Sequence, residues 1–386
     1  MKIVHITTTS PFSEIYAYQE NLIAHYHRKM GHDVTVIAPT YSTAELDKEE
    51  PIGEYALKDG IKVIRLPLLV RNRLIYEHLY LVRGLYSALL SEEPDLIFAH
   101  AVGSFNYISL VRIKKKRPAT RIVIDNHADY INSLHSPITR FLHKRIYRLL
   151  LVPSLIKVTD IFYGVTPSRC DFLHEVYGVP KDKIKLLLMG ADDEKMKIEE
   201  KETLRDGVRS RFRIEKEDFL VVTGGKIDPL KNIHLLAKAI NNSSYSKIKM
   251  LIFGTISKDL ESLFDHLKSD RIQCIGWIPS EDVYKYFYAA DVVIFPGLHS
   301  VLWEQAVASQ VPCAFTRMKG FEHLDFGGNC ILMDGNDEGY YQQIVEHLYL
   351  DRDLYSSLLK KSRSEKAFSF HYSRIAKQVL NDCEIS

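Results

Sequence analysis

The chain has 386 residues, and its 51 Lys and Arg residues nearly balance its 49 Asp and Glu residues. This length predicts two domains, and the charge balance argues against a protein whose whole surface binds nucleic acid. The five cysteines are scattered without a Cys-x-x-Cys pair, so we expect neither a disulfide framework nor a structural zinc site. The first apolar run is too short for a signal-peptide core, and no stretch is long enough for a membrane span, which together predict a cytoplasmic protein.

The first half of the chain alternates apolar runs with amphipathic stretches. KIVHIT at 2–7 is followed by a helical pattern from Tyr18 to Met30 and then by DVTVIAP at 33–39. This strand–helix–strand unit is typical of a parallel sheet with helices on both faces. Further strands are predicted at 61–68, 95–100, 121–127, 161–166 and 183–189.

The charge of the chain is unevenly distributed. Residues 101–150 carry ten Lys and Arg residues against two acids, whereas residues 301–350 carry two against seven. The segment 136–158, which begins inside the basic window and extends past it, mixes apolar residues with Arg140, Lys144, Arg145 and Arg148. Such a helix is either a core helix with a solvated basic face, or a surface that lies on anionic lipid.

A charged stretch from Asp193 to Arg213 has no apolar periodicity, and we interpret it as the connection between domains. The second half then repeats the strand–helix pattern and ends in a predicted helix at 371–380. Strands are predicted at 219–225, 249–254, 271–277, 291–297, 311–316 and 330–333. We therefore predict two doubly wound α/β domains with a ligand-binding cleft between them.

The segment GGKIDPLKNIHLLAKAI at 224–240 has the composition of an anion-binding turn. Gly224 and Gly225 end a strand and allow close approach of a ligand to the backbone, and Lys226 and Lys231 bracket the turn before a helix. Two cations at this spacing suit a diphosphate. The alternative is that Lys231 is an ordinary solvated lysine.

A second motif is FPGLHSVLWEQAVASQVPCAFT at 295–316. We expect Ser300 to cap a helix from Val301 to about Ser309, with its N-terminus facing a ligand. Glu304, one turn into this helix, could accept hydroxyl groups of a ribose or sugar. The alternative is a first-turn acid that complements the helix dipole.

These motifs, taken in order, resemble the retaining family-4 glycosyltransferases of the two-domain GT-B fold. The resemblance covers most of the chain. It rests on YQENLIAHYHRKMGHDVTVI (18–37), VTPSRCDFLHEVYGVPKDKIKLLLMGAD (165–192), GGKIDPLKN (224–232), IFG (252–254), IGWIPSEDVYKYFYAADVVIFPG (275–297) and WEQAVASQVPC (303–313).

The resemblance implies a role for several residues. Lys226 and Lys231 would hold the diphosphate of a nucleotide-sugar donor, Ile278 would frame the nucleobase, and Glu304 would bind the ribose. His127 is the best match to the family's histidine near the donor sugar, and His100 is the second choice. The remaining donor-side residues are Gly225, Gly254, His299, Ser300 and Val301, and the remaining acceptor-side residues are Phe12 and Ser13.

The chain departs from the family pattern in two places. Pro296 stands where the family has the first of two glutamates, eight residues before Glu304, so His299 is a candidate for its polar role. The loop at 7–21 also lacks the glycine pair that is common in the family.

The resemblance implies transfer of a sugar from a nucleotide-diphosphate sugar to a glycan or lipid-linked acceptor, in cell-surface polysaccharide or glycolipid synthesis, with retention and without a metal or other cofactor. It favours peripheral association of the basic segment with an anionic membrane on the inner face of the cell membrane. Two alternatives are a nucleotide-sugar 2-epimerase of the same fold and a catalytically silent binding subunit. The implied domains are 1–195 on the acceptor side, joined by a terminal helix at 368–386, and 196–367 on the nucleotide-sugar side.

Overall fold

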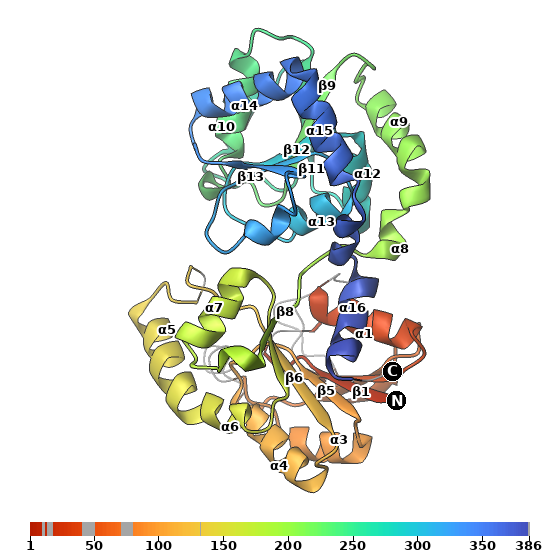
Figure 1. Ribbon diagram of the computed structural model, residues 1–386, viewed down its shortest axis with the longest axis vertical. Helices are drawn as coiled ribbons and strands as arrows, with labels where there is room; N and C mark the ends of the chain where they lie inside the picture. Colours follow the sequence, from red (N-terminus) through yellow and green to blue (C-terminus); the bar gives the residue numbers. More distant parts are fainter. Residues whose placement is uncertain (10–11, 14–17, 41–50, 71–79, 132, 385–386) are drawn as a thin grey trace. The chain divides into compact units, whose positions relative to one another are not determined.

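The computed structural model describes residues 1–9, 12–13, 18–40, 51–70, 80–131 and 133–384. Contacts divide the chain into two units (Figure 1): Met1–Met189 with Tyr372–Ser386, and Gly190–His371. The divisions therefore lie a few residues from the sequence-based boundaries, and the terminal helix is part of the first unit.

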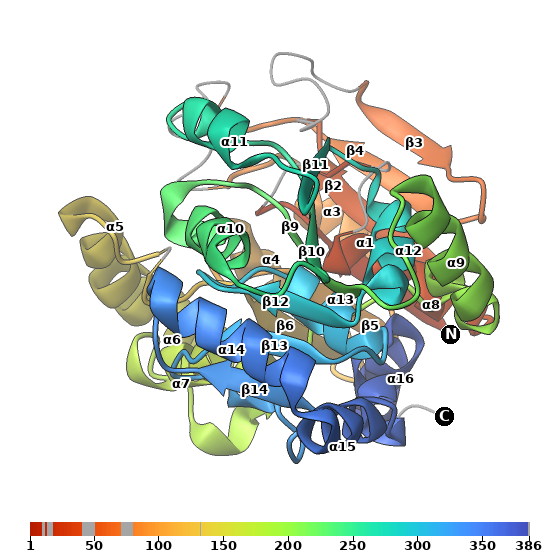
Figure 2. The ribbon, with the colours of Figure 1, turned by 90° about the horizontal axis from the view of Figure 1, so that it is seen from above.

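The first unit is built on an eight-stranded sheet in the order β3-β4-β2-β1-β5-β6-β7-β8. Every neighbouring pair is parallel except β3 and β4. The strands are β1 (Lys2–Ile6), β2 (Asp33–Pro39), β3 (Gly53–Ala56), β4 (Lys62–Leu66), β5 (Leu96–Ala99), β6 (Arg121–Asn126), β7 (Ile161–Gly164) and β8 (Ile184–Leu186). The sequence patterns predicted all of these except β3, an exposed edge strand without a buried face (Figure 2).

Helices cover both faces of this sheet, because alternate side chains of each strand point to opposite faces. One core packs Val4 and Ile6 with α3, α4, α6 and α7. The other packs Ile3 with α1 and α16. The helices are α1 (Gln19–Lys29), α3 (Leu85–Glu92), α4 (Ile108–Lys116), α5 (Pro137–Phe141), the π-helix η2 (Leu142–Leu151), α6 (Val152–Ile156), α7 (Pro167–Glu175) and α16 (Tyr372–Asp382).

The terminal helix α16 packs beside α1, from the opposite end of the chain (Figure 1). The Tyr163 hydroxyl lies 3.0 Å from Oδ2 of Asp382, and the Gln378 side chain donates to the carbonyl of Leu186 at 2.8 Å. These bonds attach α16 to β7 and to the end of β8.

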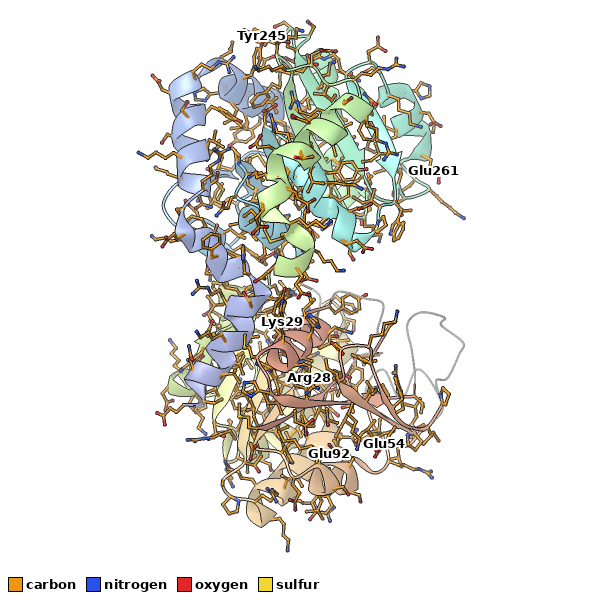
Figure 3. All side chains as sticks on the ribbon, turned by 90° about the vertical axis from the view of Figure 1, so that its right-hand side faces the viewer. Arg28, Lys29, Glu54, Glu92, Tyr245 and Glu261 are labelled. Atoms are coloured by element: carbon orange, nitrogen blue, oxygen red, sulfur yellow. The ribbon has the colours of Figure 1, made fainter. Side chains whose placement is uncertain are left out.

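The side chain of Glu92, labelled in Figure 3, is buried at the amino ends of β1, β2 and β4. Lys2 and Lys62 place their ammonium groups 3.0 and 2.8 Å from it, and the Thr35 hydroxyl donates to it at 2.8 Å. Burial alone would raise the pKa of Glu92, but these partners outweigh it and lower the pKa. Ion pairs and a hydrogen bond to Glu92 thus stabilise the amino edge of the sheet.

The second unit is built on a six-stranded, wholly parallel sheet in the order β11-β10-β9-β12-β13-β14. All six strands agree with the sequence patterns: β9 (Phe219–Gly224), β10 (Ile248–Phe253), β11 (Ile272–Gly276), β12 (Val292–Phe295), β13 (Cys313–Thr316) and β14 (Cys330–Met333). Its helices are α8 (Asp193–Met196), α9 (Lys201–Arg211), α10 (Ile233–Asn242), α11 (Glu261–Leu267), α12 (Val283–Ala289), α13 (Leu302–Ala308), α14 (Glu338–Leu350) and α15 (Arg352–Ser362).

The interpretation of 193–213 as a connection between domains is wrong. Most of this stretch forms α8 and α9, and α9 packs on α12 within the second unit. Arg205 and Arg209 reach past the end of α12 to the Asp291 carboxylate at 2.7 and 3.1 Å, and both also donate to the carbonyl of Ala289. The sequence of this stretch has no apolar periodicity because arginine side chains, rather than an apolar face, attach it to the domain.

Across the described ranges, no helix is both long enough and apolar enough to span a membrane.

Candidate functional site

Three glycines bring the loops after β9, β10 and β12 together at the carboxyl edge of the second sheet. Gly254 has a φ of 115°, and a Cβ there would overlap the carbonyl oxygen of Gly225. A Cβ at Gly297 would overlap the backbone of Leu230 and Lys231. Gly225 lies against the Leu302 side chain at the start of α13, where a Cβ would come within 3.0 Å. The predicted donor-side segments 224–232 and 252–254 and the start of the segment 295–316 are therefore neighbours in space.

The two lysines of the anion-binding turn differ in their surroundings. The Lys226 side chain is 76 % exposed, and its ammonium group lies 3.4 Å from the Asp228 carboxylate. Lys231 is half-buried, and its ammonium group donates to the carbonyls of Leu298 and His299 at 2.6 and 3.2 Å. Burial lowers the pKa of Lys231. Lys231 therefore holds the loop after β12 in place, whereas Lys226 presents its charge to solvent.

Glu304 is fully buried in the first turn of α13, between two histidines. His299 Nε2 lies 2.9 and 3.0 Å from the two carboxylate oxygens, and His323 Nε2 lies 3.2 Å from Oε1. Burial alone would raise the pKa of Glu304, but the charges and hydrogen bonds of His299 and His323 outweigh it and lower this pKa to about 2. Both oxygens of the Glu304 carboxylate are thus hydrogen-bonded within the second unit. To bind a ribose, as the resemblance implies, the carboxylate would have to give up contacts with His299 or His323.

The expected cap at Ser300 is not formed by its side chain. The helix α13 begins at Leu302, and its N-cap residue is Val301, without a side-chain hydrogen bond. The Ser300 carbonyl instead accepts from the backbone N–H of Trp303 at 3.0 Å. The prediction of a Ser-capped helix from Val301 is therefore wrong, because the PGLHS loop keeps Ser300 one residue farther from the helix than a cap requires.

Ile278 lines a pocket of about 350 Å³ beside the edge strand β11. The neighbouring Trp277, which lines the same pocket, is 74 % exposed. An exposed indole offers a flat apolar face on which an aromatic base can stack. Sequence reasoning singled out Ile278 and missed Trp277, although the Gly-Trp pair preceding Ile278 was part of the motif.

In the first unit, His127 and His100 share one buried carboxylate, that of Asp125 at the end of β6. Oδ2 of Asp125 lies 2.8 Å from His100 Nδ1 and 3.4 Å from His127 Nε2, and Oδ1 accepts from the N–H of Ala101 at 2.7 Å. His100 is buried, while the His127 side chain is 35 % exposed. Sequence reasoning named the two histidines as alternatives, but the structure joins them through Asp125.

Phe12 and Ser13 are buried in the first unit. The Phe12 carbonyl accepts from the Arg65 guanidinium, and the Ser13 carbonyl accepts from the Asn21 side chain, each at 3.0 Å. Both predicted acceptor-side residues thus hold a loop in place. Much of the remainder of the loop at 7–21, where a glycine pair was expected, lies outside the described residues.

The basic segment 136–158 forms a continuous helical stretch from α5 through the π-helix η2 to α6. Tyr147 and Leu151 face the core. Four large apolar side chains and four cations point outward: Ile138, Phe141, Leu149 and Leu150, with Arg140, Lys144, Arg145 and Arg148.

Among the described residues, no group of three or more His, Cys, Asp or Glu side chains is arranged to hold a metal ion. All five cysteines are free thiols.

Two family models match the chain, one in each half. The model "Glycosyltransferase Family 4" matches residues 18–195, and the model "Glycosyl transferases group 1" matches residues 217–351. The two matches include the predicted donor-side residues together with His100 and His127, whereas Phe12 and Ser13 lie before the first matched residue.

Among curated proteins, the chain is similar to mannosylfructose-phosphate synthase of Agrobacterium fabrum, with 22 % identity over 238 residues, 57 % of this chain. The chain spans about half of that relative, 52 % of its length. Among solved structures, a glycosyltransferase of Rickettsia africae has a TM-score of 0.73 at 15 % identity, with 99 % of this chain and 97 % of that chain covered. HepE of Anabaena in complex with UDP has a TM-score of 0.69 at 14 % identity, with 99 % of both chains covered.

Proposed function

Because the chain belongs to the family-4 and group 1 glycosyltransferases and has their two-domain GT-B fold, we propose that it transfers a sugar from a nucleoside-diphosphate sugar to a hydroxyl group of a glycan or lipid-linked acceptor. We further propose that the transfer retains the configuration of the sugar and that lysines, rather than a metal ion, balance the charge of the diphosphate.

The observation that carries this proposal is the cluster of glycine turns and lysines at the carboxyl edge of the second sheet. Gly225 and Gly254 let the loops after β9 and β10 approach each other closely, and Lys226 presents its ammonium group to solvent beside Gly225. The exposed face of Trp277 and the pocket that it forms with Ile278 suit the nucleobase. A solved structure of HepE holds UDP, and another holds UDP-glucose, on a chain of the same fold.

The chemistry of transfer explains why cations are placed there. The bond between the sugar C1 and the diphosphate oxygen breaks, and its electron pair goes to the diphosphate. The acceptor hydroxyl oxygen forms the new bond to C1, and its proton leaves with the diphosphate. Lys226 stabilises the negative charge that develops on the leaving group, and Lys231 supports it by holding the loop at 298–299.

Release of nucleoside diphosphate from a panel of nucleotide sugars, with and without candidate acceptors, tests the proposal. Wild type should release diphosphate in an acceptor-dependent way, and Lys226→Ala should raise KM for the donor about tenfold or more while the fold stays intact. Lys268→Ala removes the same charge from an exposed position after α11 and should leave turnover unchanged. Conversion of the donor without a glycoside product would instead indicate an epimerase, and absence of any turnover would indicate a silent binding subunit.

We also propose that the outward face of α5 and η2 lies on an anionic membrane. Phe141, Leu149 and Leu150 can enter the headgroup layer while Lys144 and Arg145 meet its negative charge. Arg148 contributes less, because its guanidinium already donates to the carbonyl of Glu175 at 2.7 Å.

Co-sedimentation with vesicles of phosphatidylglycerol and phosphatidylcholine tests this surface. Lys144→Gln/Arg145→Gln and Phe141→Ser/Leu149→Ser should each lose binding to the anionic vesicles. Lys115→Gln/Lys116→Gln removes two charges from the exposed end of α4 and should bind like wild type. Equal binding by all three variants would contradict the proposed surface.

A further inference from the structure

Three buried histidines form a hydrogen-bonded chain between α16 and the carboxylate of Asp125. His27 Nε2 on α1 lies 3.0 Å from the carbonyl oxygen of Ala376, and His27 Nδ1 lies 3.1 Å from His5 Nε2 on β1. His5 Nδ1 lies 3.1 Å from His100 Nε2, and His100 Nδ1 lies 2.8 Å from Oδ2 of Asp125. Every ring nitrogen of the three imidazoles therefore takes part in one contact of the chain.

The fold explains why these side chains meet. His5 and Asp125 have the same strand parity as Ile3 and Val123, which face α1 and α16 in the core cluster of that side. His100 directly follows β5, two residues after Phe98, and stacks on its ring at 4.3 Å. Since β1 pairs with β5 and β5 pairs with β6, the three polar groups line up across the carboxyl edge of the sheet.

The two ends of this chain determine how many protons it needs. The carbonyl of Ala376 can only accept, so the proton of that contact lies on His27 Nε2. The ionised carboxylate of Asp125 also only accepts, so a proton lies on His100 Nδ1. The two contacts between imidazoles need one proton each. The four contacts together need four protons, but three neutral imidazoles carry only three.

We propose that His5, His27 and His100 form a buried imidazole chain that holds one excess proton against Asp125 and so controls how much of the charge of Asp125 acts on His127. The excess proton makes His100 an imidazolium with both of its ring nitrogens donating. His5 and His27 are then neutral, each with its proton on Nε2.

The electrostatics of the site agree with this placement of the proton. Burial lowers the pKa of His5 well below its ordinary value, and burial lowers that of His27 to about 3, so neither carries the charge. Burial alone would raise the pKa of Asp125, but the charge of His100, followed by that of His127, outweighs it and lowers the pKa. These directions exclude His5, His27 and the carboxyl group of Asp125 as carriers of the extra proton, and the contacts of the imidazole chain then leave His100.

The chain influences His127 through the shared carboxylate. Burial alone would lower the pKa of His127, but Asp125 outweighs it and raises the pKa. Arg169 opposes this effect and Glu20 adds to it, while His32 faces the far end of the chain beside His27. An imidazolium at His100 neutralises part of the charge of Asp125, so removal of the excess proton would raise the pKa of His127 further.

The wild-type protein, labelled with ¹⁵N at its histidines, tests the proton count directly. Two-bond ¹H–¹⁵N correlation spectra distinguish the two neutral tautomers from the imidazolium, and loss of a signal in each His→Gln variant assigns it. We expect Nε2–H tautomers for His5 and His27 and an imidazolium for His100 at neutral pH. A neutral His100 beside a protonated Asp125, or the opposite tautomers along the chain, would overturn the proposal.

A pair of variants at His27 separates the proton count from simple packing. In His27→Gln, the amide can still donate to the carbonyl of Ala376 and accept from His5, so the need for the extra proton remains. In His27→Leu, both contacts disappear, and two neutral imidazoles satisfy what is left of the chain. We expect the pKa of His127 to rise by about one unit in His27→Leu and to change by less than about 0.3 units in His27→Gln.

Equal shifts in both variants would refute the proton count, because a purely structural role makes no distinction between them. If His27→Leu does not fold, the tautomers of wild type and of His27→Gln still decide the question. These spectra need neither donor nor acceptor, so their outcome is independent of the proposed glycosyl transfer. Only an effect of the chain on the pH profile of transfer rests on that function, since His127 is the histidine that the family resemblance implicates.

Discussion

Replacement of Glu304 by glutamine should remove an acid-sensitive part of the stability of the second unit. In wild type, the buried carboxylate is held between His299 and His323, and its pKa falls from 4.5 to about 2. A shift of this size corresponds to about 3 kcal/mol of stabilisation of the folded state. The amide of the glutamine side chain keeps an acceptor for one imidazole but cannot titrate.

The sign of the pH dependence follows from the direction of the shift. A carboxyl group with a depressed pKa in the folded state stabilises that state above the pKa of the unfolded chain. This contribution is lost as the pH falls from about 4.5 toward about 2. The difference in unfolding free energy between wild type and Glu304→Gln should therefore shrink by about 2 kcal/mol between about pH 6 and about pH 3.

The fluorescence of Trp303 offers an assay that is confined to the second unit. The chain has two tryptophans, Trp277 and Trp303. Trp303 is buried, and the centre of its ring lies 5.3 Å from that of His299. In a Trp277→Phe background, urea unfolding followed at Trp303 gives the free energy of this unit at each pH. If the difference in unfolding free energy between wild type and Glu304→Gln stays constant from about pH 6 to about pH 3, the electrostatic account of Glu304 and its two histidines is refuted.

Two further predictions concern the frame of the second unit. Asp291→Ala should destabilise the second unit by about 3 kcal/mol in the same urea assay, because Arg205 and Arg209 would lose a partly buried partner. Asp265→Ala removes an exposed acid, and an equally small effect of both changes would contradict this prediction. Gly254→Ala should impair folding or donor affinity, because the new Cβ would overlap the carbonyl of Gly225. A Cβ at Gly276 meets open space, so Gly276→Ala should cost only about 1 kcal/mol of backbone strain. Similar stability and donor affinity in the two variants would contradict the close approach of Gly254 to Gly225.

Strand positions were predictable because parallel strands are buried on both faces and therefore read as continuous apolar runs. The exposed strand β3 has no such run, since it lies at the edge of the sheet and, among the described strands, pairs only with β4. The stretch that contains Arg205 and Arg209 also has no apolar run, but it packs on the domain all the same, so its helix was missed. Its packing depends on guanidinium groups that bind backbone carbonyls and Asp291, and hydropathy patterns carry no signal for such contacts.

The prediction of a donor-side turn rests on a local motif, in which Lys226 and Lys231 lie five residues apart. The glycines beside them predicted close approach of a ligand to the backbone, and in the structure they allow close approach between neighbouring loops. The second partner of Glu304, His323, was not predictable in the same way. His323 lies 19 residues farther along the chain, in the 3-10 turn Glu322–Leu324 after β13, and only the order of the strands brings it to α13.

The imidazole chain shows where a residue-by-residue interpretation stops. The pattern of KIVHIT places His5 in a buried strand, and a lone histidine in such a run suggests nothing beyond a satisfied core residue. Its meaning depends on β5 and β6 as successive neighbours in the sheet and on a helix from the far end of the chain that supplies the carbonyl of Ala376. Both ends of the imidazole chain accept hydrogen bonds, so the number of contacts always exceeds the number of imidazoles by one. The excess proton therefore arises from the two acceptors at the ends and not from the number of histidines. A buried histidine row that ended in an apolar side chain instead of the carbonyl of Ala376 would need no such proton, which is why His27→Leu and His27→Gln must differ at His127.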